Sequence, residues 1–180
     1  MARASTRARV YAAVLSLAAE GGFAGLTMEG IAARAGAGKQ TLYRTWSSPA
    51  AVLLDALLDQ SVDASGEVAI PDTGDLRADL ETLIAGMIAE LADPARDRLL
   101  RAVTAELQTD PVISADVLER LLGPQLRAIA DRLAKAGVGT PDDGAELLLG
   151  PVFHRWLLRT RPFAPDWPAA HVARVLRALS

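Results

Sequence analysis

The hydrogen-bonding side chains with the clearest chemistry lie in one segment near the N-terminus, residues 39–45. Its polar members are Lys39, Gln40, Thr41, Tyr43, Arg44 and Thr45. Lysine and arginine can reach phosphates or guanine edges, glutamine can pair with adenine through two hydrogen bonds, and hydroxyls can bond bases or backbone. Leu42 and Trp46, four residues apart, would give a helix made of this segment its buried side. The segment therefore predicts a helix that presents polar groups to DNA.

A shorter helix is predicted just before it, ending in a glycine-containing turn. Thr27 is a good N-cap because its hydroxyl accepts an unpaired backbone N–H, and Glu29 follows where the helix dipole favours a negative charge. Three apolar residues at helical spacing form its packing stripe: Ile31, Ala32 and Ala35. Gly36-Ala37-Gly38 then interrupts the helix, because glycine tolerates left-handed backbone angles. Two helices joined in this way form a helix-turn-helix, in which one helix braces the other against a groove.

The combined pattern resembles the DNA-binding domain of TetR-family transcriptional regulators. The matching positions are Thr27-x-Glu29-x-Ile31-Ala32, Ala35-Gly36 and Thr41-Leu42-Tyr43-x-x-Trp46. The resemblance runs from the first predicted helix into the fourth, and it implies a homodimeric, all-helical repressor with a divergent, ligand-binding C-terminal domain. By position, it implies that phosphates are contacted by Thr27, Tyr43 and Thr45, and that the major groove is faced by Lys39, Gln40, Thr41 and Arg44.

Four positions depart from the pattern of that family. Gly38 stands where a serine or threonine cap is usual, and Trp46 replaces the common phenylalanine. Pro49 and Ala50 replace a frequent Lys-Glu pair, so we expect a phosphate contact at the fourth helix to be missing. These changes bear on the affinity for DNA rather than on the fold.

Composition indicates a helical protein with an uneven charge. Of the 180 residues, 51% are hydrophobic and 4% aromatic, and abundant alanine, leucine and arginine favour helices over sheets. The chain has no cysteine, which excludes disulfides, thiol catalysis and zinc-thiolate sites. Residues 1–50 carry six basic and two acidic groups, whereas the remainder carries 13 basic and 20 acidic groups. A basic N-terminal part on an acidic body places a polyanionic partner at the N-terminus.

The first twenty residues have two interpretations. Arg3, Arg7 and Arg9, followed by the uncharged run 10–19, are similar to the start of a signal peptide. We favour a first helix that ends at Glu20-Gly21-Gly22, because ten apolar residues are too few to span a membrane. The protein is therefore expected in the cytoplasm, with no membrane partner. Arg3 and Arg7 are expected ahead of this helix, as a disordered tail or as an arm that reaches the minor groove.

Beyond Trp46, proline marks the start of one helix after another. Each proline follows a capping side chain, in the pairs Ser48-Pro49, Asp93-Pro94, Asp110-Pro111 and Thr140-Pro141. With Asp75 as a further cap, apolar periodicity predicts helices over about residues 49–65, 76–91, 94–109, 111–136 and 142–161. A last helix is predicted around Val172, Val175, Leu176 and Leu179. No strand is predicted, so the fold class is all-α. It comprises an N-terminal three-helix helix-turn-helix DNA-binding domain, residues 1–47, and a C-terminal helical bundle for ligand binding and dimerisation, residues 48–180.

Two Gly-Pro pairs interrupt this helical pattern, Gly123-Pro124 and Gly150-Pro151. Proline removes a backbone donor and clashes one turn back, so each long helix is expected to kink or break there. Around the second pair, residues 147–153 are apolar on all sides, and a helix of that kind must be covered all round. We expect it to pack against a twofold mate, together with the second half of the preceding helix. The alternative is a central helix buried within one subunit.

Signatures of an enzyme are lacking. His154 and His171 are the only histidines, they fall on separate predicted helices, and no carboxylate stands near them at metal-site spacing, so we expect no catalytic residue, metal or cofactor. A small hydrophobic effector is expected in the C-terminal part, although its candidate lining residues would serve equally well as ordinary core. These candidates are Met87, Leu91, Val103, Leu107, Phe153 and Trp156.

These patterns together predict a ligand-responsive transcriptional repressor that binds double-stranded DNA as a homodimer. Its two recognition helices would enter successive major grooves about 34–36 Å apart, on an inverted-repeat operator. An effector bound among the body helices would tilt the helix from Pro49 and pull the recognition helices off that spacing. Two alternatives stay open. One is a regulator of the same fold that responds to a protein partner, and the other is an all-α enzyme or protein-interaction module whose helix-turn-helix is only structural.

Overall fold

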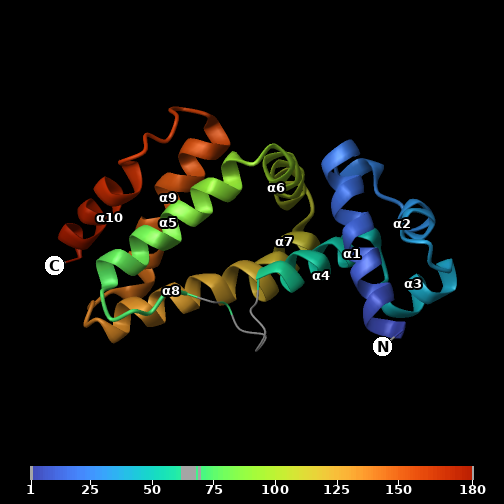
Figure 1. Ribbon diagram of the computed structural model, residues 1–180, viewed down its shortest axis with the longest axis horizontal. Helices are drawn as coiled ribbons and strands as arrows, with labels where there is room; N and C mark the ends of the chain where they lie inside the picture. Colours follow the sequence, from blue (N-terminus) through green and yellow to red (C-terminus); the bar gives the residue numbers. More distant parts are fainter. Residues whose placement is uncertain (1, 62–67, 69, 180) are drawn as a thin grey trace. The chain divides into compact units, whose positions relative to one another are not determined.

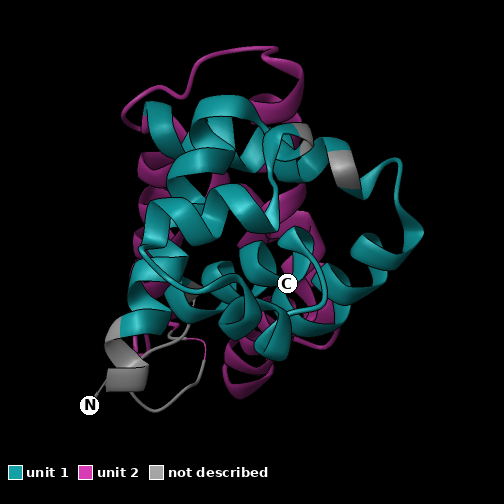
Figure 2. Ribbon diagram, turned by 90° about the vertical axis from the view of Figure 1, so that its right-hand side faces the viewer, with its two compact units in different colours: residues 1–62, 94–121 teal, residues 63–93, 122–180 magenta. Residues whose placement is uncertain are grey.

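This computed structural model describes residues 2–61, 68 and 70–179, and every regular element among them is a helix. The predicted all-α class is confirmed. The chain divides into two compact units, coloured separately in Figure 2: unit 1 is Met1–Val62 with Pro94–Leu121, and unit 2 is Asp63–Asp93 with Leu122–Ser180. Within the described ranges, no helix has the length and hydropathy needed to cross a membrane.

Unit 1 is built around the N-terminal helix. Its elements are α1 (Ala2–Gly21), a 3-10 turn η1 (Phe23–Gly25), α2 (Met28–Ala35), α3 (Lys39–Thr45), α4 (Pro49–Ser61), α6 (Pro94–Leu107), α7 (Pro111–Val117) and most of a π-helix, η2 (Leu118–Leu122). Helix α1 packs against α2, α4 and α6, with α3 next to α2 (Figure 1). The shared core contains fully buried side chains from α1, α2, α3 and α4, among them Val14, Ile31, Leu42 and Val52.

Unit 2 contains α5 (Leu76–Ala92), α8 (Gly123–Lys135), α9 (Pro141–Leu158) and α10 (Trp167–Ala178). Helix α8 packs along α9, and α10 packs against both α5 and α9. The fully buried residues include Leu80 and Ile84 on α5, Leu133 on α8, and Leu148 and Val152 on α9. The four helices thus enclose the hydrophobic core of unit 2.

The proline-marked helix starts are confirmed at Pro49, Pro94, Pro111 and Pro141. Three of the predicted capping side chains accept backbone N–H groups: Ser48 from Ala51 at 3.2 Å, Asp75 from Ala78 at 3.1 Å, and Asp110 from Val112 at 2.8 Å. Thr140 is the exception, since its side chain makes no cap hydrogen bond. The local sequence therefore indicates where these helices begin, because proline fixes the φ angle of the first turn and, at Pro49 and Pro111, an accepting side chain precedes it.

The predicted start of the first helix was wrong. Helix α1 begins at Ala2, so Arg3 and Arg7 lie within it and form neither a tail nor an arm ahead of it. Arginine is a good helix former, and the Arg7 guanidinium donates to the Tyr11 hydroxyl one turn later, so the helix continues to the N-terminus. The predicted end of α4 near residue 65 lies outside the described residues, and the helix is described as far as Ser61.

The two Gly-Pro pairs behave differently. The predicted long helix over 111–136 changes to π-helical hydrogen bonding over η2, directly before Gly123-Pro124, while the backbone stays helical from α7 to α8. At the second pair α9 runs through Pro151 without interruption, so a break was wrongly predicted there, whereas a kink stays a prediction. It ends at Leu158 rather than near residue 161, because Arg159 adopts left-handed angles with φ of 51°.

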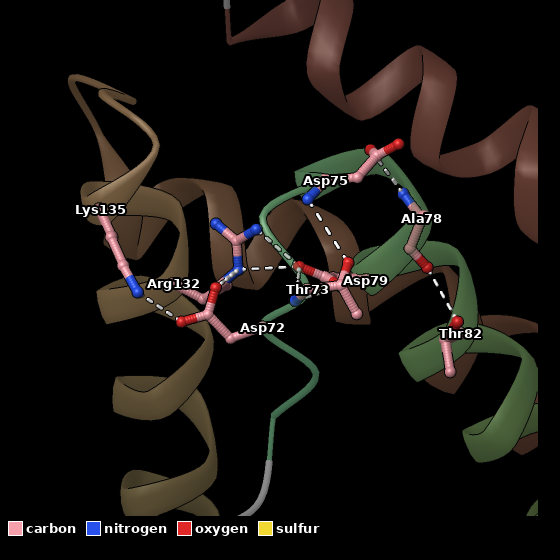
Figure 3. A network of polar contacts seen from close by, with 8 residues as sticks. All are labelled: Asp72, Thr73, Asp75, Ala78, Asp79, Thr82, Arg132 and Lys135. Carbon is pink, nitrogen blue, oxygen red and sulfur yellow. Dashed lines mark hydrogen bonds and ion pairs between the residues drawn. The ribbon is translucent and has the colours of Figure 1, made fainter.

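A buried ion pair joins α5 to α8 (Figure 3). The Arg132 guanidinium donates to the Asp79 carboxylate at 2.6 Å and 3.1 Å, and the two side chains are 7% and 1% exposed. Thr73 adds its backbone N–H and its hydroxyl as donors to Asp79, while Asp72 pairs with both Arg132 and Lys135. Burial raises the pKa of Asp79, but the hydrogen bonds from Thr73 and Arg132 outweigh it and hold that pKa below its ordinary value.

We predict that Asp79→Ala destabilises the protein by about 3–5 kcal/mol, because it leaves the Arg132 charge buried without its main partner. Urea denaturation measures this loss. The matched control is Asp75→Ala, which removes only the helix cap of α5 and should cost about 1 kcal/mol. Because the pKa of Asp79 is lowered on folding, its contribution is present near neutral pH and is lost as the pH falls below about 4. Equal losses in the two variants would contradict a buried ion pair.

Candidate nucleic-acid interface

The turn between α2 and α3 follows the predicted geometry. The Thr27 hydroxyl accepts the Gly30 N–H at 3.0 Å and so caps α2. Gly36 ends that helix with left-handed angles, φ 60° and ψ 39°. Gly38 has an ordinary extended conformation at the start of α3, so only one of the two glycines uses the freedom that the residue type provides. The Thr27 hydroxyl keeps its own proton, which leaves it able to donate to a phosphate while it caps the helix.

Helix α3 has one buried side and one exposed side. Leu42 is fully buried and Trp46, just past the helix, is 7% exposed. The six polar residues of the helix are all exposed: Lys39, Gln40, Thr41, Tyr43, Arg44 and Thr45. The Tyr43 ring is 53% exposed, so little of it is used in the core of unit 1. The structure thus brings the sequence-predicted DNA-contacting residues of α3 together on its accessible surface, with exposed Thr27 at the start of α2.

Two of these residues also make contacts within the chain. The Lys39 ammonium lies 3.3 Å from the Glu29 carboxylate, and both side chains are more than half exposed. A backbone hydrogen bond and the Lys39 ammonium lower the pKa of Glu29. The Thr45 hydroxyl donates to the Thr41 carbonyl at 3.3 Å. The exposed ion pair is weak enough for Lys39 to exchange Glu29 for a phosphate or a base edge.

Helix α2 is held against α1 by two arginines whose contacts were not predicted from the sequence. Arg34 donates to both oxygens of Glu20 at 2.9 Å, and hydrogen bonds from Arg34 and then Ser16 lower the pKa of Glu20 to about 2. Arg9 donates to the Ala35 carbonyl at 3.1 Å, at the end of α2. These contacts fix the angle between α1 and the helix-turn-helix. Sequence spacing alone gives no signal for them, because the partners lie 14 to 26 residues apart.

The candidate effector-lining residues are divided between the two units. Met87 is half-buried and Leu91 buried on α5, and on α9 Trp156 is buried while Phe153 is 38% exposed. The remaining two belong to unit 1, where Val103 is part of the core and Leu107 packs against it. A cleft of about 540 Å³ on α9 is lined by other residues: Asp143, Glu146, Leu147, Gly150, Pro151 and His154. The effector-lining set stays a prediction.

The histidines show no arrangement typical of an enzyme or a metal site. His154 is exposed, whereas His171 is buried, stacks on the Trp167 ring at 4.5 Å and contacts the Leu148 carbonyl oxygen through Nε2 at 2.8 Å. Burial lowers the pKa of His171. In the described part of the chain, no three His, Asp or Glu side chains gather closely enough to hold a metal ion.

Comparison with known families explains the exposed helix. Residues 10–56 match the family described as bacterial regulatory proteins, tetR family, and residues 70–175 match the tetracyclin repressor-like C-terminal domain. The chain belongs to the TetR family. It is therefore a helix-turn-helix transcriptional regulator that binds DNA, as the resemblance of the sequence implied.

Individual TetR-family proteins resemble the chain over most of its length. An uncharacterised HTH-type regulator of Mycobacterium tuberculosis, Rv1556, is 32% identical over 176 residues, which are 93% of this chain and 84% of that protein. The DNA-binding transcriptional repressor TetR of Mycobacteroides abscessus is 32% identical over 148 residues, covering 82% and 76%. The crystal structure of the TetR family transcription regulator SCO0332 superposes with a TM-score of 0.76 at 28% identity, covering 97% and 98%.

Proposed function

We propose that this TetR-family regulator is a repressor that binds an inverted-repeat operator as a homodimer and leaves it when a small hydrophobic effector binds. One observation carries the DNA-binding part: all six polar residues of α3 are exposed while Leu42 and Trp46 fix the helix from below. The similar protein of Mycobacteroides abscessus is named a repressor, which supports the sign of regulation. The chain then acts as a cytoplasmic binding protein and not as an enzyme.

In this proposal residues 1–47 form the DNA-binding domain and residues 48–180 the ligand-binding and dimerisation domain. The major groove is read by Lys39, Gln40, Thr41 and Arg44, and phosphates are contacted by Thr27, Tyr43 and Thr45. Groove edges supply the acceptors that lysine and arginine need, and the adenine edge matches the donor and acceptor of a glutamine amide. Phosphate contacts set the register of the helix on the duplex, and base contacts supply the specificity.

The exposed side of α9 is the proposed dimer surface. Leu147, Phe153, Leu157 and Leu158 on this helix are 38% to 60% exposed, an unusual concentration of large apolar side chains at the surface. A second copy of the chain would cover them. The buried side of the same helix packs within unit 2 through Leu148 and Val152. This distribution favours a twofold mate over a central helix covered within one subunit.

Gly150 marks the middle of that surface. A glycine inside a helix costs about 1 kcal/mol relative to alanine, and a proline costs more. No neighbour among the described residues requires this glycine, because a Cβ atom built on it meets none of their atoms within 4 Å. A partner helix that crosses closely at Gly150 would account for the missing side chain.

The effector part of the proposal is supported by the family of the C-terminal domain. Residues 70–175 match the tetracyclin repressor-like C-terminal domain, and the apolar lining candidates favour a hydrophobic molecule. Those candidates are Met87, Leu91, Val103, Leu107, Phe153 and Trp156. The effector has to bind the state that cannot bind DNA more tightly than the DNA-binding state, by a few kcal/mol, for the protein to leave the operator.

We predict that Lys39→Ala weakens binding to a duplex enriched from a random pool about tenfold, because it removes the proposed hydrogen bond to a base edge in the major groove. Tyr43→Ala should weaken binding without unfolding the chain. Fluorescence anisotropy at 50 to 200 mM salt measures both effects.

The chain provides a matched control in its other lysine, Lys135, which is exposed and pairs with Asp72 on unit 2. Lys135→Ala changes the net charge equally and should leave the affinity almost unchanged. If Lys39→Ala and Lys135→Ala have the same effect, α3 is not the helix that contacts DNA.

We predict that Gly150→Leu converts the dimer to monomers at micromolar concentration, because four added carbon atoms occupy the proposed helix crossing. The fold should be retained, since the position faces open space in the subunit and leucine is the better helix former. Gly86→Leu on α5 is the control, because a Cβ at Gly86 also meets nothing within 4 Å. Sedimentation equilibrium separates the outcomes. A wild-type monomer, or a dimer that tolerates Gly150→Leu, would disprove this interface.

A further inference from the structure

The Asp55 carboxylate on α4 joins three other elements of unit 1. Its Oδ2 accepts the indole N–H of Trp46 at 2.8 Å, at the end of α3. Its Oδ1 accepts from the Arg120 guanidinium at 2.6 Å, in the π-helix η2. The Arg7 guanidinium on α1 lies 3.8 Å from Oδ2. The Asp55 side chain is 19% exposed, whereas the Arg120 and Arg7 side chains are 43% and 57% exposed, so a half-buried carboxylate meets two cations that reach the solvent.

The Trp46 ring could fill its place in the core without the hydrogen bond to Asp55. The Trp46 ring packs edge-on to the Tyr11 ring, with centroids 6.1 Å apart, and its backbone N–H donates to the Leu42 carbonyl at 2.8 Å. Phenylalanine, which the family pattern favours at this position, would fill much of the same space but has no donor. The indole N–H therefore adds a polar anchor between the last turn of α3 and the Asp55 carboxylate on α4.

Arg120 occupies an unusual piece of backbone. The π-helix η2 spans Leu118–Leu122. Such turns are rare in proteins, and those that occur are often found at functional sites. The chain passes from unit 1 to unit 2 directly after Leu121, one residue beyond Arg120. Any change of register in η2 would therefore move Arg120 and also act on the connection to α8.

We propose that Asp55 is a positioning residue that couples the end of the recognition helix α3 to the π-helix η2. Arg120 holds one carboxylate oxygen, which fixes the rotation of the group and directs the other oxygen at the Trp46 indole. A shift of η2 to α-helical hydrogen bonding withdraws Arg120, and the carboxylate then turns away from Trp46. This inference rests on the proposed DNA-reading role of α3 and names a route by which the connection to unit 2 regulates it.

A purely structural role for Asp55 predicts something different. In that case each of its contacts would add its own increment of stability, and an exposed ion pair such as Arg120–Asp55 would contribute little. Removing Arg120 would then leave the Trp46 hydrogen bond intact. The two possibilities differ in what happens at the indole nitrogen.

The first test observes the indole directly by ¹H–¹⁵N spectroscopy of the intact chain. The three tryptophans give three indole signals, and Trp46→Phe assigns the signal of Trp46. Arg120→Gln should shift the Trp46 signal and speed its exchange with solvent about fivefold, as expected for a weakened hydrogen bond. The signals of Trp156 and Trp167 should stay in place. Arg101→Gln is the control, because Arg101 pairs with Asp97 on α6 at 2.9 Å.

The second test measures affinity for a duplex enriched from a random pool. Trp46→Phe and Arg120→Gln should each weaken binding about fivefold, and the double variant no further, because both act through one carboxylate. Arg101→Gln should bind as the wild type does. The coupling would be overturned if Arg120→Gln left the Trp46 indole signal unchanged. It would also be overturned if the loss of affinity in the double variant equalled the product of the two single losses. The spectroscopic test uses no DNA, so its failure is distinguishable from a failure of the proposed function.

Discussion

The burial of Leu42 and Trp46 is the constraint on which the rest of unit 1 depends. Helix α3 has seven residues, too few to be stable alone in water, so it persists through the contacts of its apolar side with the core. Once these two side chains are buried, the pitch of the helix turns its polar residues outward. The chemistry of the surface and the stability of the helix are therefore consequences of one packing interaction.

The surface that results is not as basic as the sequence suggests. Of the arginines in the first fifty residues, Arg34 is paired with Glu20, Arg9 with the end of α2, and Arg7 with Tyr11 and Asp55. These side chains set the position of the helix-turn-helix against α1 and α4. The cationic groups carried by α3 itself are Lys39 and Arg44, so the net charge of the N-terminal part overstates the charge at the DNA-facing surface.

Local features of the fold could be predicted from the sequence, and long-range polar contacts could not. The Thr27 cap, the left-handed Gly36 and the proline-marked helix starts each depend on a few neighbouring residues. The Arg132–Asp79 pair joins residues 53 apart, and Arg120–Asp55 joins residues 65 apart. Periodicity carries no information about such pairs. The π-helix was not predicted for a related reason. A kink or break was expected at Gly123-Pro124, but the hydrogen-bonding pattern of the helix there depends on packing within the unit.

The central proposal is that two copies of α3 bind in adjacent major grooves of the DNA. Selection of bound duplexes from a random pool, with the full-length protein at physiological salt, tests it most directly. If a homodimer binds in this way, the selection should enrich an inverted repeat whose half-site centres are separated by about 10 base pairs or a multiple of that spacing. Failure to enrich any duplex, or enrichment of a single motif without its inverted copy, would contradict it.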